Sequence, residues 1–184
     1  MTTAMSGCLV LGDPQYLDPE RTAPRITPLT RPEELRTELS AEDGSWDVSF
    51  RVTITSEDAG ETVELALLRN FGGGAAGGDR PYESEVGRSN LAPATLSDGP
   101  RPVTVDWFDP GVSGEDYDCA RVTLLATHEF RGGSGPDFYC PADPTDVDTV
   151  TWFVLRCRDT EPRCTFDLCN DNEDEEANYC DPPE

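Results

Sequence analysis

Cysteine is the residue type in this sequence that points most directly to chemistry. The chain of 184 residues contains seven cysteines, and six of them lie after residue 118. So many cysteines in a short chain are typical of an oxidising compartment, in which thiols pair as disulfides. The six later cysteines form an even set for three bonds: Cys119, Cys140, Cys157, Cys164, Cys169 and Cys180.

Parity constrains how these six cysteines pair. Three lie in the body of the chain and three in its acidic end, so at least one disulfide must join the two parts if all six pair within the chain. A register that sets Cys119 opposite Cys157 in two antiparallel strands would bring them within disulfide reach. We therefore expect a Cys119–Cys157 bond, which leaves Cys140 to bond one of the three end cysteines while the other two bond each other.

His128 is the only imidazole, and the chain has no lysine because all 14 basic residues are arginine. The absence of lysine excludes a Walker lysine, a Schiff-base lysine and a lysine general base. The serines within residues 111–114 and 132–135 do not match the five-residue pattern of a nucleophile elbow, and we interpret both segments as turns. We expect His128 to be packed or at the rim of a sheet, and a hydrolase with a loop-built site near His128 remains an alternative.

An acidic cluster near the C-terminal end offers the hard oxygen ligands that Ca²⁺ prefers. The cluster lacks the central glycine and the Asp alternation of an EF-hand loop, so the simpler interpretation is a solvated acidic run. The weak candidates for Ca²⁺ ligands are Asp171, Glu173, Asp174, Glu175 and Glu176. We otherwise expect no cofactor.

The segment around Cys8 reads Ala4-Met5-Ser6-Gly7-Cys8. It resembles a bacterial lipobox, in which small residues precede a cysteine that becomes the lipidated first residue of the mature protein. Ser6 and Gly7 match this pattern, whereas Met5 stands where leucine is usual and no hydrophobic region precedes it. The resemblance implies a lipoprotein, and Leu9 in place of an aspartate after the cysteine implies sorting to the outer membrane. Because no signal-peptide core precedes Cys8, either the translation start lies upstream of Met1 or the leader has been removed from this sequence. The alternative interpretation of Cys8 is a lone thiol near the terminus.

The charge of the chain limits its partners. The formal net charge is −23, from 37 acidic and 14 basic residues, which repels phosphate backbones and anionic membrane surfaces alike. Nucleic acid is therefore excluded as a partner, and any membrane contact would run through the lipid alone. No stretch approaches the roughly 18 apolar residues that a membrane-spanning helix requires.

Alternating apolar residues predict β-strands along most of the chain. The clearest strand is 46–55, followed by 61–70 and 101–108, and two more at 119–130 and 149–157 pair so that Leu124 faces Trp152. Residues 33–40 are compatible with a strand or a helix, with a strand favoured, and residues 80–101 are polar and turn-rich.

Five or six short strands around a core of Trp, Phe, Val and Leu predict an all-β protein, a small two-sheet sandwich of immunoglobulin-like character with a disulfide-tied acidic C-terminal tail. We expect a lipidation site and Pro-rich tether over residues 1–32, the sandwich over 33–158 and the acidic, Cys-rich tail over 159–184. The tail alone carries ten acidic residues and one arginine.

These features together favour a non-enzymatic lipoprotein of the bacterial cell envelope that acts as a surface binding or structural module. Its expected location is extracytoplasmic, either lipid-anchored at the outer membrane or secreted, with a protein or envelope partner that the sequence does not identify. The alternatives are a Ca²⁺-dependent adhesion element and the hydrolase near His128.

Overall fold

A computed structural model describes residues 22–30, 35–38, 46–57, 60–70, 82, 84–94, 98–109, 117–132, 138–157 and 180. All regular elements in these ranges are β-strands. They are β1 (Arg25–Pro28), β2 (Leu35–Glu38), β3 (Trp46–Thr55), β4 (Val63–Arg69), β5 (Ser84–Leu91), β6 (Arg101–Asp109), β7 (Tyr117–Thr127) and β8 (Asp148–Cys157).

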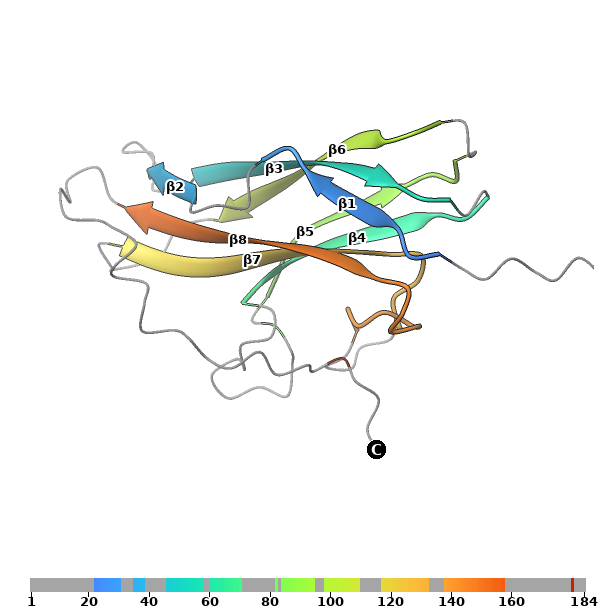
Figure 1. The fold of residues 1–184 in the computed structure, drawn as a ribbon. Coiled ribbons are helices and arrows are strands. Elements are labelled where there is room, and N and C mark those ends of the chain that lie inside the picture. The colour runs from blue at the N-terminus through green and yellow to red at the C-terminus, as the bar shows by residue number, and fades with distance from the viewer. Residues whose placement is uncertain are drawn as a thin grey trace, which may run out of the picture.

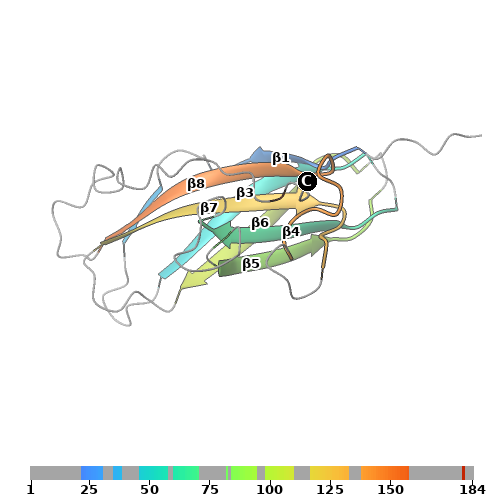
Figure 2. The same ribbon diagram turned by 90° about the horizontal axis from the view of Figure 1, so that it is seen from below.

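The eight strands form two sheets that face each other (Figure 1). One sheet has three strands in the order β1-β3-β6, and the other has five in the order β2-β8-β7-β4-β5. All pairs are antiparallel except β2 with β8, which is parallel. Figure 2 shows the same layers from below, with β7, β8, β4 and β5 in front of β3 and β6. The chain is an all-β, two-sheet sandwich of the immunoglobulin-like kind, as the sequence predicts.

The core lies between the sheets and follows from the alternation of the strands. In β3 the side chains of Phe50, Val52 and Ile54 are fully buried, whereas Arg51 between them is exposed. Trp152 of β8 packs against Phe50 across the interface, with ring centroids 4.7 Å apart. One face of β3 thus supplies the core and the other meets solvent, which is the pattern of a half-buried strand.

The register of β7 and β8 differs from the predicted one by two residues. Cys119 lies opposite Leu155, and Cys157 lies opposite Tyr117. Trp152 faces Val122 rather than Leu124. A shift of two residues leaves every side chain on its predicted face, so the apolar pattern alone could not tell the two registers apart. The argument that Cys119 and Cys157 are directly opposed is therefore wrong.

The sandwich begins earlier than residue 33. β1 lies inside the region predicted to be a Pro-rich tether, and it pairs with the end of β3 from Arg25 opposite Thr55 to Pro28 opposite Val52. Pro28 is tolerated because β1 is an edge strand, where a missing backbone N–H breaks no ladder inside the sheet. β2 confirms the strand favoured for residues 33–40.

β1 also ties the two sheets together at their shared edge. The backbone N–H of Ile26 donates to Oδ2 of Asp148 at 2.7 Å, and Nε1 of Trp152 donates to the carbonyl of Thr30 at 3.0 Å. Both acceptor–donor pairs join residues that are 122 positions apart in the sequence. β1 and β8, the first and last of the strands in the described ranges, therefore lie together at this edge.

The opposite edge is closed by β5, a strand that the polar composition of residues 80–101 did not predict. A Cβ atom on Gly87 would lie 2.9 Å from Cγ1 of Val105 and 3.0 Å from the backbone oxygen of Asp106. Glycine at position 87 thus permits the close approach of β5 to β6.

A second apolar cluster covers part of the outer face of the five-stranded sheet. Ala66 and Leu68 of β4 and Leu125 of β7 point away from the main core and are buried all the same. The segment between β7 and β8 folds over them and contributes Phe130 and Tyr139. β4 is therefore buried on both faces, where the sequence predicted one apolar face only.

Candidate functional site

Three polar residues meet at one end of the sandwich, each placed there by a strand. Ser56 directly follows β3, His128 directly follows β7, and Asp146 lies two residues before β8 begins. Because β3 and β7 belong to different sheets, the contact between Ser56 and His128 joins the two sheets at this end.

The three side chains form a continuous hydrogen-bonded array. Oγ of Ser56 lies 3.0 Å from Nε2 of His128, and Nδ1 of His128 lies 2.7 Å from Oδ1 of Asp146. A carboxylate only accepts hydrogen bonds, so Nδ1 carries the proton in this contact. In the neutral ring Nε2 is then an acceptor, and the hydroxyl of Ser56 donates to it.

Asp146 also binds the backbone that follows β7. Its Oδ2 accepts from the backbone N–H of His128 at 3.1 Å and from Oγ1 of Thr127 at 3.4 Å. The backbone N–H of Asp146 in turn donates to the carbonyl of Asp143 at 3.0 Å. Asp146 thus closes the segment between β7 and β8 onto the end of β7.

The array is enclosed by the protein. The His128 side chain has no exposed surface, and that of Asp146 is 2% exposed. Ser56 is half-buried, so its hydroxyl is the member nearest to solvent. Both ring nitrogens and both carboxylate oxygens have partners within the chain.

The geometry of the array matches that of a catalytic nucleophile, a general base and a carboxylate that orients the base. The two contacts fall in the range of about 2.6–3.2 Å that such groups use, and the order of roles is serine, histidine, aspartate. The same contacts also give buried polar groups their hydrogen-bond partners and hold the segment between β7 and β8 in place. This structural role needs no catalytic activity.

The sequence identified only one member of this array. His128 was expected to be packed or at a rim, and it is buried at the end of β7. The serine that reaches it is Ser56, which lies 72 residues away in the sequence, and not a serine of the two Gly-rich segments. The signal that could have pointed to Ser56 is its position directly after the clearest strand.

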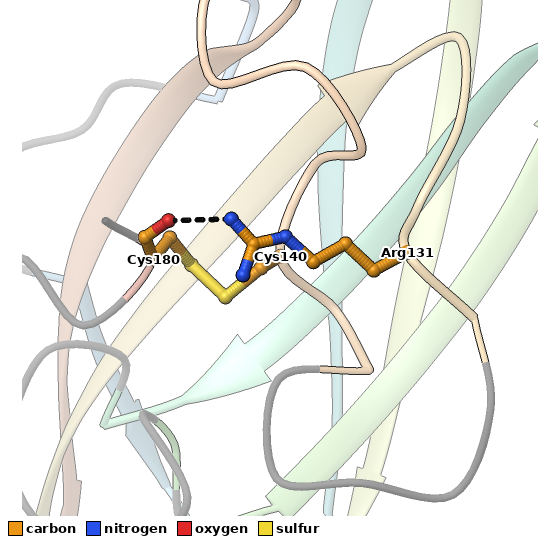
Figure 3. Close-up of a disulfide and its surroundings, with 3 residues drawn as sticks. All are labelled: Arg131, Cys140 and Cys180. Atoms are coloured by element: carbon orange, nitrogen blue, oxygen red, sulfur yellow. Dashed lines mark hydrogen bonds between the residues drawn. A yellow bond between two sulfur atoms is a disulfide. The ribbon is translucent and has the colours of Figure 1, made fainter. Parts of the chain in front are cut away.

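One predicted disulfide is present in the described part of the chain. Cys140 bonds Cys180, with 5.3 Å between their Cα atoms, so the end of the chain is tied to the segment between β7 and β8. Figure 3 shows the guanidinium of Arg131 beside this bond, where it donates to the carbonyl of Cys180 at 2.9 Å. This confirms the expectation that Cys140 bonds one of the three end cysteines.

Cys140 is held in place by a short ladder. The backbone N–H of Arg131 donates to the carbonyl of Cys140, and that of Ala142 donates to the carbonyl of Glu129, each at 2.9 Å. Cys119 is also disulfide-bonded. Since Cys140 and Cys180 are paired, the partner of Cys119 is Cys8, Cys157, Cys164 or Cys169.

Several predicted site residues lie outside the described residues. They are Cys8, Cys164, Cys169, Asp171, Glu173, Asp174, Glu175 and Glu176. Lipidation at Cys8 and Ca²⁺ binding by the acidic cluster therefore stay predictions. Within the described ranges no group of three or more His, Cys, Asp or Glu side chains could hold a metal ion. Those ranges also contain no helix long and apolar enough to cross a membrane.

No family model matches the sequence, and no curated protein matches it. Among solved structures, the chain is similar to an ASH/PapD-like domain of human CEP192 with a TM-score of 0.34 and 11% identity, covering 84% of this chain and 97% of that one. It is also similar to the apo form of the Calx CBD1 domain, with a TM-score of 0.30 and 16% identity, covering 74% of this chain and 98% of that one.

Proposed function

We propose that this chain is a non-enzymatic, extracytoplasmic β-sandwich that is anchored by a lipid on Cys8 and serves as a surface binding or structural module of a bacterial cell envelope. The burial of the Ser56–His128–Asp146 array is the observation that supports a non-enzymatic role. His128, the only imidazole, has a fully buried side chain whose two nitrogens are occupied by Ser56 and Asp146. In this role the array joins the sheets and fixes the loop.

The extracytoplasmic location is supported by the disulfides. Cys140–Cys180 closes a separation of 40 residues, and bonds of this kind persist where the surroundings are oxidising. Cys8 lies 17 positions before the start of β1 at Arg25 (25 − 8), which leaves a spacer between a lipid and the folded domain. The resemblance of Ser6-Gly7-Cys8 to a lipobox supports the lipid itself.

The outer face of the three-stranded sheet is the contact surface that this module offers. Its exposed side chains are polar and short for the most part, and they include Ser49, Arg51, Thr104 and Asp106. Oγ of Ser49 donates to Oδ1 of Asp106 at 2.6 Å across β3 and β6, which orders part of this surface. The outer face of the five-stranded sheet is partly covered by the segment between β7 and β8, so the two faces are not equivalent.

The anchor is tested by expressing the gene with its native upstream sequence in a bacterium. The mature protein should begin at Cys8, carry diacylglycerol by mass spectrometry and partition into the detergent phase. The Cys8→Ser variant is the control, and it should stay in the aqueous phase with an unchanged melting temperature. A wild-type protein that begins elsewhere or carries no lipid would contradict the anchor.

A hydrolase is the second candidate, and the geometry of the array favours it specifically. Oγ of Ser56 would attack an ester carbonyl as its proton passes to Nε2 of His128, and that proton would leave with the alcohol. Water would then cleave the acyl-serine and return the proton to Ser56. Asp146 would hold the ring in the required tautomer.

A fluorophosphonate probe separates the two candidates. The module predicts no phosphonylation of Ser56 by peptide mapping and no turnover of p-nitrophenyl acetate above the Ser56→Ala background. Labelling of Ser56 that is lost in His128→Ala and kept in Ser49→Ala, the exposed-serine control, would establish the hydrolase instead.

A further inference from the structure

The outer face of the three-stranded sheet is open to solvent along all three strands. Its exposed side chains include Arg25, Thr27, Ser49, Arg51, Thr104 and Asp106. The other sheet differs, because an aromatic cluster with Phe130 and Tyr139 lies over part of its outer face. Between the charged residues the open face carries short side chains, so a second sheet could pack against it at the usual spacing of about 10 Å.

Opposite charges lie in neighbouring rows of this face. The register of β3 and β6 sets Arg51 opposite Thr104 and Ser49 opposite Asp106. The two rows are two residues apart along each strand, which is roughly 7 Å at about 3.3 Å per residue. Arg51 and Asp106 therefore occupy diagonal positions on one surface.

The two charges do not neutralise each other within the chain. Oδ1 of Asp106 accepts from Oγ of Ser49 at 2.6 Å, and no ion pair among the described residues joins Asp106 to Arg51. Arg51 contacts the end of β1 through its backbone, which accepts from Leu29 and Thr30 and donates to Oγ1 of Thr30. Both charged groups can thus meet a group of another molecule.

An exposed leucine adjoins these two rows. Leu29 continues the outward alternation of Arg25 and Thr27, and its backbone N–H donates to the Arg51 carbonyl at 2.8 Å. Its side chain is 54% exposed, and Phe153 on the other sheet is the only other exposed large apolar side chain in the described ranges. An apolar side chain with charged neighbours has the composition of a contact surface, in which a polar rim surrounds an apolar centre.

The arrangement is complementary to itself. In a two-fold dimer both copies use the same patch, so a residue i of one copy contacts a residue j of the other and the reverse. A two-fold axis that crosses the strands midway between the two rows would lay the Arg51 row of each copy over the Asp106 row of the other. The two Leu29 side chains would then meet beside two reciprocal pairs of opposite charges.

We propose that the partner of this face is a second copy of the chain, joined to the first by reciprocal Arg51–Asp106 pairs and by contact between the two Leu29 side chains. The assignment rests on the proposed role of this face as the contact surface, and it names the partner. Arg51 suits the pairing because its guanidinium can bind a carboxylate through two hydrogen bonds.

The size of the face makes this dimer weak in solution. Three strands about 4.8 Å apart and the ten residues of β3 give roughly 500 Å² per copy, less than the 800 Å² or so that each partner buries in a standard interface. The net charge of −23 on each copy also opposes association, although salt screens it beyond about 8 Å. A lipid anchor would favour the dimer by raising the effective concentration of the two copies.

Charge reversal tests the assignment on the full, oxidised chain without its lipid. On dilution from millimolar to micromolar concentration, amide chemical shifts in β1, β3 and β6 should change, whereas those in β7 should stay constant. Arg51→Asp and Asp106→Arg should each weaken the association about tenfold or more, because each sets like charges opposite one another. The double variant restores opposite charges and should restore the concentration-dependent shifts.

Arg88→Asp is the matched control, because it reverses an exposed arginine on β5 and changes the net charge by the same amount as Arg51→Asp. It should leave the self-association unchanged. Wild-type shifts that do not depend on concentration, or a double variant that stays monomeric, would overturn the dimer. Lipid on Cys8 is measured separately, so a monomeric chain that carries the lipid would refute this partner and leave the anchor standing.

Discussion

His128 and Asp146 lie 18 residues apart in the sequence and meet with 2.7 Å between Nδ1 and Oδ1, in a contact that almost no solvent reaches. The contact fixes the loop after β7, and through Ser56 it extends to the other sheet. Removing this contact should therefore lower the free energy of unfolding of the whole sandwich.

Asp146→Ala should lower the free energy of unfolding by about 1–3 kcal/mol, because it leaves the backbone N–H and Nδ1 of His128 buried without an acceptor. Urea unfolding monitored by tryptophan fluorescence measures the loss. Asp106→Ala is the control, since its carboxylate accepts a hydrogen bond from Ser49 on an exposed surface and its removal should change stability by less than about 0.5 kcal/mol. Equal losses in the two variants would contradict a buried clamp.

Trp152→Phe should cost about 1–3 kcal/mol, because it removes the donor to the Thr30 carbonyl and leaves space beside Phe50. The amide hydrogens of Leu29 and Thr30, which both donate to Arg51, should exchange faster in this variant. Phe153→Leu, at a side chain 53% exposed on the same strand, should leave the exchange of the Leu29 and Thr30 amides unchanged. An unchanged exchange rate in Trp152→Phe would mean that Trp152 does not hold the residues that follow β1.

Gly87→Ala should destabilise the protein by about 1–3 kcal/mol, since the new Cβ would lie 2.9 Å from Cγ1 of Val105. A double-mutant cycle with Val105→Ala measures whether this clash is the cause. The two losses should add to more than the loss in the double variant, because removing Cγ1 relieves the contact. If the two losses in stability are additive, the destabilisation by Gly87→Ala does not come from a contact with Val105.

Cys140→Ser should lower stability by about 3–4 kcal/mol, the chain-entropy estimate for a loop closed over 40 residues. The melting temperature of the variant should lie below that of the oxidised wild type and, because Cys119 keeps its disulfide, above that of the fully reduced protein. A variant as stable as the oxidised wild type would show that the bond does not constrain the unfolded chain.

The strands with regular apolar alternation could be predicted from the sequence. In β3, β7 and β8 the side chains that form the core between the sheets recur at every second residue, and this periodicity fixes both the strand and its inward face. The register could not be fixed in the same way, because a shift of two residues satisfies the same pattern.

β1, β5 and the array depend on contacts between distant parts of the chain. β5 contains few large apolar residues, and Gly87 has meaning only once β6 lies against it. β1 contains Pro28, which discourages a strand until the end of β3 provides an edge to pair with. Ser56 and His128 approach through the packing of two sheets, so no local spacing reveals their contact.

The closure of one edge by β1 and β8 also bears on when the domain can form during synthesis. The hydrogen bonds of Ile26 and Trp152 join positions 122 residues apart, so the segment that contains β1 cannot make these contacts before β8 has emerged from the ribosome. Such long-range pairing slows folding. A nascent chain would therefore keep this edge of the sandwich open until β8 has been made, even though most of the other strands would by then be able to pair.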